Sequence, residues 1–553
     1  MFGNENARIF RFMAERDAII RDVTERVVDE ISKKSRRGGD AGLEYVLNEA
    51  AFLEMKRLER GSSALDLRPY SYWQELARSV GRSEDPARTR VLRELVAAYA
   101  EDVAGRFTPS VYRFASKVLP VGLAAVFNAT NPENLVGSWR HLSERIIVEG
   151  AVAHLRALAE IGTLVVVPTH SSNLDSIVVG WALEEAGLPP VTYGAGKNLF
   201  TNPLTSFFMH NLGAYKVDRR IGHGIYKAVL KCYSEVLLER GFHSLFFPGG
   251  TRSRSNQVES KIKLGLLGTA LTAYRHNLLA RKPKPKVFIC PLTINYHLVL
   301  EAETLIGEHL RTDGGARYII EDDEFADLGR IAKFVSKTMK MEHTLYLRFG
   351  EPLDPFGNPV DLAGISRDPH ERPVDLERYL WRDGEVSADA ARDAAYTKEC
   401  GAAVTRAFAR NTVVTSSAFV AAVVQAALQD AWPHLDTYRL LRVARGELVP
   451  TDAIMRRAER LQLGLREATR HRRLALSHDV ERLPVDALVA RGAKVLGMYH
   501  ATPVLRRASN GLEVCSPQLL LFYANRLAGF GLEPLLREPG AAAGPALPKG
   551  GGE

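Results

Sequence analysis

The chain has 553 residues, of which 46% are hydrophobic and 25% are charged, so it is long and apolar enough to bury the cores of two or three domains. This composition excludes intrinsically disordered and fibrous proteins. The net charge of +8 favours an anionic partner or an anionic lipid surface without indicating nucleic acid.

The N-terminal region shows a helical pattern. Residues 1–17 carry charges throughout and lack an apolar run closed by small residues, so they do not resemble a secretory signal. Farther along, Leu43, Val46, Leu47 and Ala50 recur at spacings of three and four, which is typical of amphipathic helices. We therefore expect a helical N-terminal region over residues 1–140.

An alternating pattern of strands and helices follows. Four apolar runs, at residues 163–168, 244–247, 287–294 and 344–349, are separated by segments long enough to form helices. Because such alternation is typical of α/β proteins, we expect an α/β domain over residues 141–355.

The rest of the chain is first polar and rich in proline, and then helical again. We expect a helical C-terminal region over residues 356–536 and a disordered tail over residues 537–553, which are mostly Gly, Pro and Ala. Residues 411–429 are uncharged, but Ser, Thr and Gln interrupt them, whereas a membrane span needs about 20 mainly apolar residues. We interpret this segment as a buried or interfacial helix.

The first candidate for chemistry is an imidazole and a carboxylate, His170 and Asp175, at the end of the apolar run 163–168. Open α/β sheets place their ligand sites at such strand ends. Asp175 can accept the imidazole N–H and leave the other ring nitrogen to take a proton from a hydroxyl. Alternatively, Ser172 and Asp175 form a capping box that opens a helix near Ile177, and both roles remain open.

The spacing alone is a weak signal, because an H-x-x-x-x-D match arises by chance in a chain of this length. His370 and Asp375 have the same spacing but lie in a polar segment that contains proline and follows no strand. We expect no catalytic role for this second pair.

Two further segments carry arginines after short strands. Arg252 and Arg254 follow a glycine turn, and in an extended segment both side chains point the same way, so two guanidiniums could bind one phosphate. Arg219 and Arg220 end the block 213–220. For both segments the alternative is a solvated turn or strand end with surface arginines.

Taken together, these blocks resemble the glycerolipid acyltransferase family. The resemblance lies in four ordered motifs: the H-x-x-x-x-D box at His170 and Asp175, a G-x-x-x-x-D-R block at residues 213–219, an F-P-x-G-T-R block at residues 247–252, and a strand with proline at residues 287–291. Lys197, Lys263 and Gly265 fall where the family has accessory residues, and residues 349–352 resemble its closing strand. The resemblance implies an α/β acyltransferase core, a mixed sheet with flanking helices, between helical N-terminal and C-terminal regions.

The flanking helices and the segments 291–301 and 411–415 look like the long glycerol-3-phosphate acyltransferase branch. Two positions depart from the family pattern. Gly249 stands where the family usually has glutamate, and Ser171 stands where the glycerol-3-phosphate enzymes often have arginine. Because Gly249 and Gly250 are adjacent, we expect a turn committed to glycine geometry, which Gly249→Glu would disturb.

The resemblance implies transfer of a fatty acyl group from an acyl thioester to the sn-1 hydroxyl of glycerol 3-phosphate, the first step of phospholipid synthesis. His170 and Asp175 would be catalytic. The substrate site implied by the resemblance consists of Lys197, Arg219, Gly250, Thr251, Arg252 and Arg254. The donor, acyl-CoA or acyl carrier protein, would be a co-substrate, and we expect no further cofactor and no metal, because the ligand spacings of metal sites are absent from the sequence.

The alternatives are acyl transfer to 1-acylglycerol 3-phosphate (lysophosphatidate), which would use the same catalytic residues, and a non-catalytic lipid-surface relative, suggested by Gly249. Nucleic-acid binding is not expected, because the basic run 281–286 is short and lacks interleaved aromatic residues. We expect peripheral association with an anionic membrane, on its cytoplasmic side, through basic and amphipathic surface.

Overall fold

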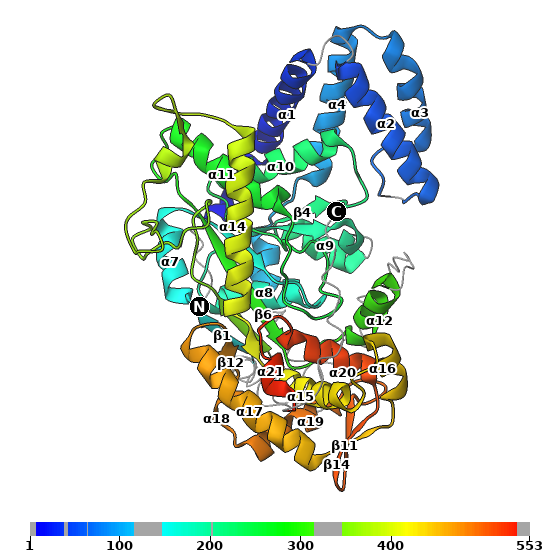
Figure 1. Cartoon of the computed structure of the whole chain (residues 1–553). Coiled ribbons are helices and arrows are strands. Elements are labelled where there is room, and N and C mark those ends of the chain that lie inside the picture. The colour runs from blue at the N-terminus through cyan, green and yellow to red at the C-terminus, as the bar shows by residue number, and fades with distance from the viewer. Residues whose placement is uncertain are drawn as a thin grey trace.

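The structure is a computed structural model that describes residues 7–37, 42–63, 65–115, 146–200, 203–313 and 345–538. A central mixed sheet with helices on both faces lies between a group of N-terminal helices at one end and a C-terminal region at the other (Figure 1). The predicted fold class, an α/β core between helical flanking regions, is confirmed. The predicted domain boundaries stay predictions, because residues 116–145 and 539–553, which include most of the predicted tail, lie outside the described residues.

The central sheet has the strand order β1-β7-β6-β2-β5-β3-β4. Strands β6, β2, β5, β3 and β4 run parallel to one another, whereas β7 pairs with β6 in the antiparallel sense. The carboxyl ends of the five parallel strands therefore meet at one edge of the sheet. The strands are β1 (Ile146–Gly150), β2 (Thr163–Pro168), β3 (Thr192–Gly196), β4 (Ala214–Val217), β5 (Ser244–Leu245), β6 (Val287–Tyr296) and β7 (Leu345–Phe349).

The sheet is buried on both faces, since alternate residues of β2 enter different cores. Leu164 and Val166 pack on one side, whereas Val165 and Val167 pack on the other. The first face is covered by α7 (Val152–Ile161), α8 (Asp175–Glu185), α12 (Ala302–Asp313) and the C-terminal region, and the second by the end of α10 (Gly224–Glu239), α11 (Leu264–Leu279) and α14 (Ala390–Arg410). Two short helices, η4 (Lys197–Phe200) and α9 (Pro203–Asn211), connect β3 to β4.

The N-terminal helices pack on the α/β domain through α10. Apolar residues of α10 such as Val229 and Val236 share one core with Ile19 and Val23 of the first long helix. The amphipathic pattern of the sequence therefore reflects a real packed face. The elements are η1 (Arg8–Arg11), α1 (Phe12–Arg37), α2 (Gly42–Arg60), α3 (Tyr70–Ser79), η2 (Val80–Arg82) and α4 (Asp85–Val103).

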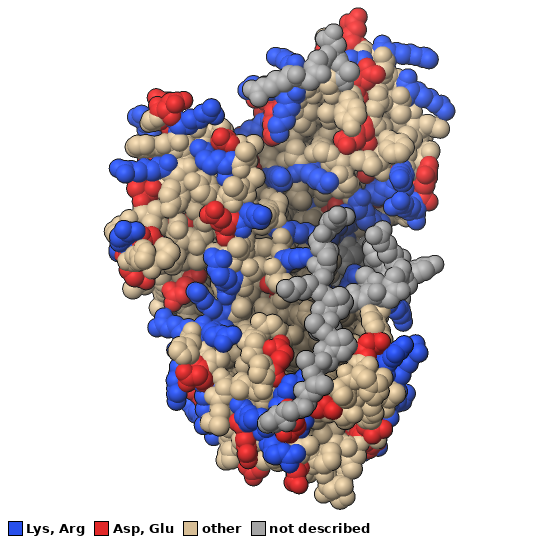
Figure 2. All heavy atoms as spheres, in the orientation of Figure 1, with Lys and Arg blue, Asp and Glu red and all other residues tan. Residues whose placement is uncertain are grey.

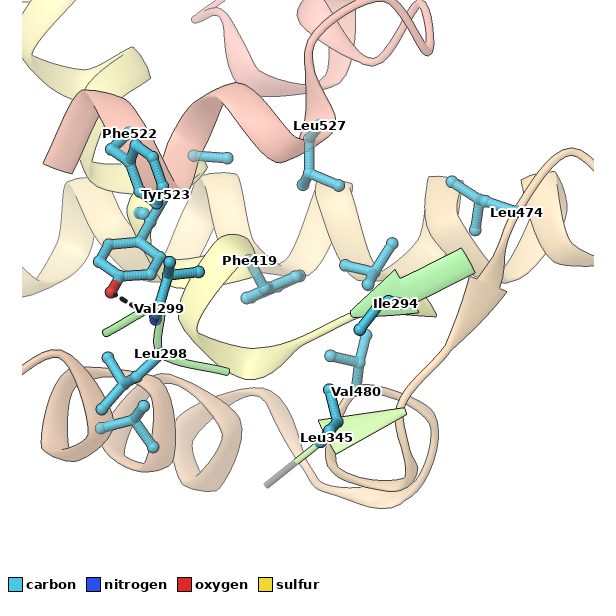
Figure 3. Packing of buried hydrophobic residues seen from close by; sticks show 14 of the residues in the cluster. Ile294, Leu298, Val299, Leu345, Phe419, Leu474, Val480, Phe522, Tyr523 and Leu527 are labelled. Atoms are coloured by element: carbon cyan, nitrogen blue, oxygen red, sulfur yellow. Dashed lines mark hydrogen bonds between the residues drawn. The ribbon is translucent and has the colours of Figure 1, made fainter. Parts of the chain in front are cut away.

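The C-terminal region is built around α15 (Ser416–Ala431), in which every residue from Ser416 to Leu428 is buried. Figure 3 shows Phe419 of this helix among Ile294 of β6 and Phe522 and Tyr523 of α20 (Pro517–Ala524). Thr415 caps the helix by accepting the Ala418 N–H. The interpretation of residues 411–429 as a buried helix is confirmed from Ser416 onward, whereas residues 413–414 form a short strand. No helix in the described ranges has both the length and the apolar character of a bilayer span.

The C-terminal region also contains short strands, which the prediction of a helical region lacks. Its strands form a sheet of order β11-β14-β13 and the pairs β10–β12 and β8–β9. The short extended segments carry too few residues to show a period of two. The remaining elements are η6 (Leu376–Leu380), β8 (Trp381–Arg382), β9 (Glu385–Val386), β10 (Val413–Val414), α16 (Thr437–Val443), β11 (Leu448–Pro450), α17 (Thr451–Arg470), β12 (Ala475–Leu476), α18 (His478–Arg482), α19 (Val485–Leu496), β13 (Leu505–Ala508), β14 (Gly511–Val514), η7 (Asn525–Leu527) and α21 (Glu533–Leu536).

Candidate active site

The candidate residues come together because each follows a parallel strand. His170 follows β2, Lys197 follows β3, Arg219 follows β4 and Arg252 follows β5, and all of these strands end at the same edge of the sheet. Ligand sites of open α/β sheets lie at this edge. Motifs that are far apart in the sequence therefore lie together at one edge of the sheet.

His170 and Asp175 form a hydrogen-bonded pair. The His170 Nδ1 lies 2.8 Å from the Asp175 Oδ2, and the histidine side chain is 15% exposed whereas the aspartate is fully buried. The imidazole stacks on the ring of Phe247, with centroids 4.3 Å apart. No residue that the structure describes hydrogen-bonds Nε2, so the outer nitrogen of the ring remains available to a substrate proton.

Asp175 is held by more donors than the histidine alone. Its Oδ2 also accepts the backbone N–H groups of Ser171 and Ser172, at 2.6 and 2.9 Å, and its Oδ1 accepts the Tyr296 hydroxyl at 2.7 Å. The bond to Ser172 N–H is one half of the predicted capping box, and α8 begins at Asp175 itself. The full capping box does not form, because the N-cap residue is Leu174 and the Ser172 hydroxyl donates to Glu301 and accepts the Leu174 N–H. The role of Asp175 that the structure shows is therefore to orient the imidazole.

Tyr296 and Glu301 lie beneath this pair and were not assigned roles from the sequence. Glu301 accepts the Ser172 hydroxyl at 2.8 Å and the Asn173 N–H at 2.9 Å, and it lies 3.7 Å from Arg252. Burial raises the pKa of the Glu301 carboxyl and also holds the pKa of Tyr296 well above its usual range. Their place in the sequence could have indicated these residues, because Tyr296 and Glu301 both come shortly after the predicted strand 287–294.

Arg219 and Arg252 form the cationic side of the site. Partial removal from water, and secondly the like charge of Arg252, lower the pKa of the Arg219 guanidinium, although the Arg219 side chain still reaches solvent. No ion pair joins Arg219 to a carboxylate within the described ranges. Two neighbouring guanidiniums, of which Arg252 has a carboxylate only at 3.7 Å, can form a site for an anion. Figure 2 shows Lys and Arg side chains around the hollow between the N-terminal helices and the α/β domain.

Arg254 is paired with a carboxylate, so its predicted contact with the acceptor phosphate, together with Arg252, stays a prediction. Residues 248–263 form an irregular loop instead of an extended strand, so the alternation of side chains does not apply. Arg254 Nε lies 3.1 Å from Glu308 of α12. Arg219 is the arginine whose electrostatic interaction with Arg252 the structure shows.

Lys197 is engaged in structural ion pairs. Its ammonium lies 2.9 Å from Asp66 and 3.0 Å from Asp218, and all three side chains are at most 8% exposed. Burial alone would raise the pKa of Asp66, but hydrogen bonds from Lys197, Ser63 N–H and Arg57 lower it to about 2. Lys197 therefore anchors the block that carries Arg219, and its charge is compensated, which differs from the predicted contact with substrate phosphate.

Gly249 and Gly250 shape the turn that precedes Arg252. The backbone angle φ is positive, 77°, at Gly250 but not at Gly249. Residue 249 therefore does not need the conformational freedom of glycine, and the reason given for expecting Gly249→Glu to disturb the turn was wrong. The Gly250 N–H already bonds Phe247 O at 3.1 Å and closes the turn, and Thr251 is exposed beside it.

The second H-x-x-x-x-D pair lies on the surface. His370 is exposed, and Asp375 caps the short helix η6 by accepting the Glu377 N–H. This placement agrees with the interpretation that the pair is a chance match. Across the described ranges, no cluster of three or more His, Cys, Asp and Glu residues is arranged to hold a metal ion.

Comparisons with known proteins agree with the motifs. Residues 150–295 match the family model described as Acyltransferase. A glycerol-3-phosphate acyltransferase of Pseudomonas syringae pv. tomato is 28% identical over 299 residues, which are 53% of this chain and 30% of that protein. One from Ectopseudomonas mendocina is 27% identical over 289 residues, 52% of this chain and 29% of that protein. The matched part thus spans less than a third of these relatives.

A solved structure, the 1-acyl-sn-glycerophosphate (LPA) acyltransferase PlsC from Thermotoga maritima, aligns with 52% of this chain and 96% of that chain. The alignment has 15% sequence identity and a TM-score of 0.24, which is too low to support an argument about function. The family model and the curated relatives confirm the predicted resemblance.

Proposed function

We propose that this chain, which carries an acyltransferase domain over residues 150–295, moves a fatty acyl group from an acyl thioester to the sn-1 hydroxyl of glycerol 3-phosphate. The observation that carries the proposal is the position of the His170–Asp175 pair at the same sheet edge as Arg219, which has no ion pair among the described residues, and Arg252, whose partner Glu301 lies 3.7 Å away. A hydroxyl nucleophile and a phosphate on one small acceptor fit these two halves. The names of the curated relatives support the same acceptor.

In this proposal His170 is the general base. Asp175 holds Nδ1 and thereby presents Nε2 to the acceptor hydroxyl, which loses its proton as the oxygen attacks the thioester carbonyl. The aspartate stabilises the imidazolium that forms, and the proton then passes to the departing thiolate. No covalent enzyme intermediate is required, because the thioester is already activated.

The acceptor phosphate binds between Arg219 and Arg252. Guanidinium groups can form paired hydrogen bonds to phosphate, and an entering dianion would remove the repulsion between the two cations. Glu301, at 3.7 Å from Arg252, orients that side chain without fully neutralising it. Backbone N–H groups near the turn at Gly249, other than the bonded N–H of Gly250, would stabilise the tetrahedral oxyanion.

We further propose that the protein associates with anionic membranes from the cytoplasmic side. The basic surface in Figure 2 and the net charge of +8 support this arrangement. Binding to vesicles of phosphatidylserine should fall at high salt, because the Debye length is about 10 Å at 0.1 M. Release by detergent alone would contradict a peripheral mode.

The proposed function is tested with purified protein and a radiolabelled acyl thioester. Acyl-CoA and acyl carrier protein are supplied in turn, and glycerol 3-phosphate, dihydroxyacetone phosphate and lysophosphatidate are the acceptors. We expect the highest rate with glycerol 3-phosphate and a rate lower by roughly 100-fold or more with His170→Ala. A preference for lysophosphatidate would assign the second acyl transfer instead, and no transfer to any acceptor would contradict the proposal.

A further inference from the structure

The space beside Gly249 is filled by a carboxylate from elsewhere in the same loop. A Cβ atom built on Gly249 would lie 2.8 Å from Oε2, 2.9 Å from Cδ and 3.0 Å from Oε1 of Glu259. These separations are shorter than real Cβ contacts, so a side chain at 249 and the present position of Glu259 exclude each other. The absent side chain is thus the reason that Glu259 can occupy this place.

The position of Glu259 also coincides with the reach of a glutamate at 249. Within one glutamate, Cβ and Cδ are about 2.5 Å apart, since two single bonds of about 1.5 Å join them at a tetrahedral angle. The Glu259 Cδ lies 2.9 Å from the Cβ position of residue 249. A glutamate at either position can therefore bring its carboxylate to nearly the same point.

The loop that delivers Glu259 is fixed at several points. Lys263 N–H bonds Pro248 O at 2.7 Å, which brings the end of the loop back to the glycine turn. The loop also meets the C-terminal region, where the Asn256 amide donates to Phe522 O at 3.1 Å and the Asn525 amide donates to Ser255 O at 3.0 Å. These bonds hold Glu259 in a defined place.

Glu259 acts on the backbone of the proposed base. Its Oε1 accepts the His170 N–H at 2.7 Å, while Ser253 N–H of the same loop donates to His170 O at 2.7 Å. Both backbone polar groups of His170 are therefore held by the loop 248–263. The second oxygen, Oε2, is buried and has no hydrogen-bond partner among the described residues.

The charge around this carboxylate is partly balanced. Burial raises the pKa of Glu259 to about 7, and nearby Asp175 adds to this rise, whereas the His170 N–H bond and Arg526 oppose it. Arg526 comes from η7 of the C-terminal region and is itself buried. A buried carboxylate lowers the stability of the fold when it is charged. Ionisable groups that are kept in such places are often functional.

We propose that Glu259 is a positioning residue that supplies, from ten positions farther along the chain, the carboxylate that the acyltransferase motif usually carries at position 249. It fixes the backbone of His170 and the glycine turn so that Nε2 faces the acceptor hydroxyl. The inference rests on the proposed function, since it names a residue that supports the proposed base. If Glu259 supplies this carboxylate, Gly249 no longer suggests that the chain is a non-catalytic relative.

The test is a double-mutant cycle at positions 249 and 259. Glu259→Ala should lower kcat roughly 10- to 100-fold with little change in either KM, because displacing a catalytic group by about 1 Å can cost 100-fold. Gly249→Glu should lower kcat to a similar extent, because two carboxylates compete for one place. The double variant Gly249→Glu/Glu259→Ala should recover most of the activity of the wild type.

Two controls separate this role from general damage. Gly180 is an exposed glycine of α8 with open space around its Cβ position, so Gly180→Glu should leave kcat unchanged. Glu259→Gln keeps an oxygen that can accept the His170 N–H and should retain more activity than Glu259→Ala. A double variant no more active than Glu259→Ala would overturn the proposal.

Melting temperatures of the same variants give a readout that does not depend on turnover. Gly249→Glu should melt several degrees lower than the wild type, and the added Glu259→Ala change should reverse most of that loss. Additive losses would overturn the exchange of carboxylates. If the wild type transfers no acyl group to any acceptor, the proposed function fails, and the melting temperatures alone decide whether Glu259 replaces a side chain at 249.

Discussion

The two sides of the candidate site differ in how completely their charges are matched. On the base side, Asp175 accepts four hydrogen bonds, from His170, Ser171, Ser172 and Tyr296. On the cationic side, Arg219 faces the like charge of Arg252. The base is therefore organised before any substrate arrives, whereas Arg219 has no ion pair among the described residues and Arg252 has only Glu301, at 3.7 Å.

The two sides therefore have different roles: the base side carries out proton transfer, and the cationic side binds the acceptor phosphate. A change on the base side should remove turnover while the acceptor still binds, and a change on the cationic side should weaken acceptor binding while the base stays intact. Lys197 belongs to neither side, since two buried carboxylates compensate it. The predictions below examine each of these assignments.

His170→Ala should lower kcat by roughly 100- to 10,000-fold, because a hydroxyl at neutral pH is a poor nucleophile without a positioned base. The measurement is the steady-state rate of acyl transfer with folding checked by circular dichroism. His370→Ala is the matched control, since it has the same motif spacing but lies on the surface, and it should match the wild type. Loss of activity in the control instead would show that the wrong pair was chosen.

Lys197→Ala should destabilise the fold by about 1.5–3 kcal/mol, because it removes the buried ammonium from Asp66 and Asp218. The loss stays in this range because the two carboxylates keep their pairs with Arg57 and Arg220. Denaturant unfolding measures this loss. Lys33→Ala removes an exposed ion pair and should cost less than about 1 kcal/mol. A Lys197→Ala protein with unchanged stability but a raised KM for glycerol 3-phosphate would restore the predicted role in phosphate binding.

Arg219→Ala and Arg252→Ala should each raise the KM for glycerol 3-phosphate about 10- to 100-fold, since hydrogen bonds between charged groups contribute about 1.5–3 kcal/mol. The KM for the acyl donor should change little. Arg254→Ala should have a smaller effect, because this side chain pairs with Glu308. Equal effects of all three substitutions would favour the original pairing of Arg252 with Arg254.

The buried carboxyl of Glu259 should make stability depend on pH. Its pKa is raised from the ordinary 4.5 to about 7, so the folded state keeps the proton to a higher pH than the unfolded chain does. The free energy of unfolding should therefore fall as the pH rises from about 4.5 to 7, by on the order of 3 kcal/mol. Denaturant unfolding at several pH values should show a larger fall in the wild type than in Glu259→Gln, since Glu235, whose pKa burial raises to about 8, contributes equally to both.

Much of the fold could be predicted from the sequence, because the strongest strands are continuous apolar runs. The runs that became β2 and β6 are buried on both faces and carry a clear signal. β3 reads Thr-Tyr-Gly-Ala-Gly and carries no such run, so it was missed. The short strands of the C-terminal region were missed for a similar reason, as their two to four residues are defined by tertiary pairing.

The candidate site was predictable where its residues are adjacent in the chain. His170 and Asp175 are five residues apart, and the strand and loop between them determine their contact. Glu259 and Tyr296 reach the same place from positions about 90 and 120 residues farther along, so no local spacing could reveal them. The ion pairs of Lys197 depend in part on Asp66 of the N-terminal region, whose packing on α10 the sequence does not specify.

The division between base and anion site is tested by calorimetric titration of glycerol 3-phosphate into the wild type, His170→Ala and Arg219→Ala. We predict that His170→Ala binds the acceptor with the Kd of the wild type although it has lost turnover. Arg219→Ala should bind at least about tenfold more weakly although the His170–Asp175 pair is intact. Loss of binding in His170→Ala, or unchanged binding in Arg219→Ala, would contradict this division.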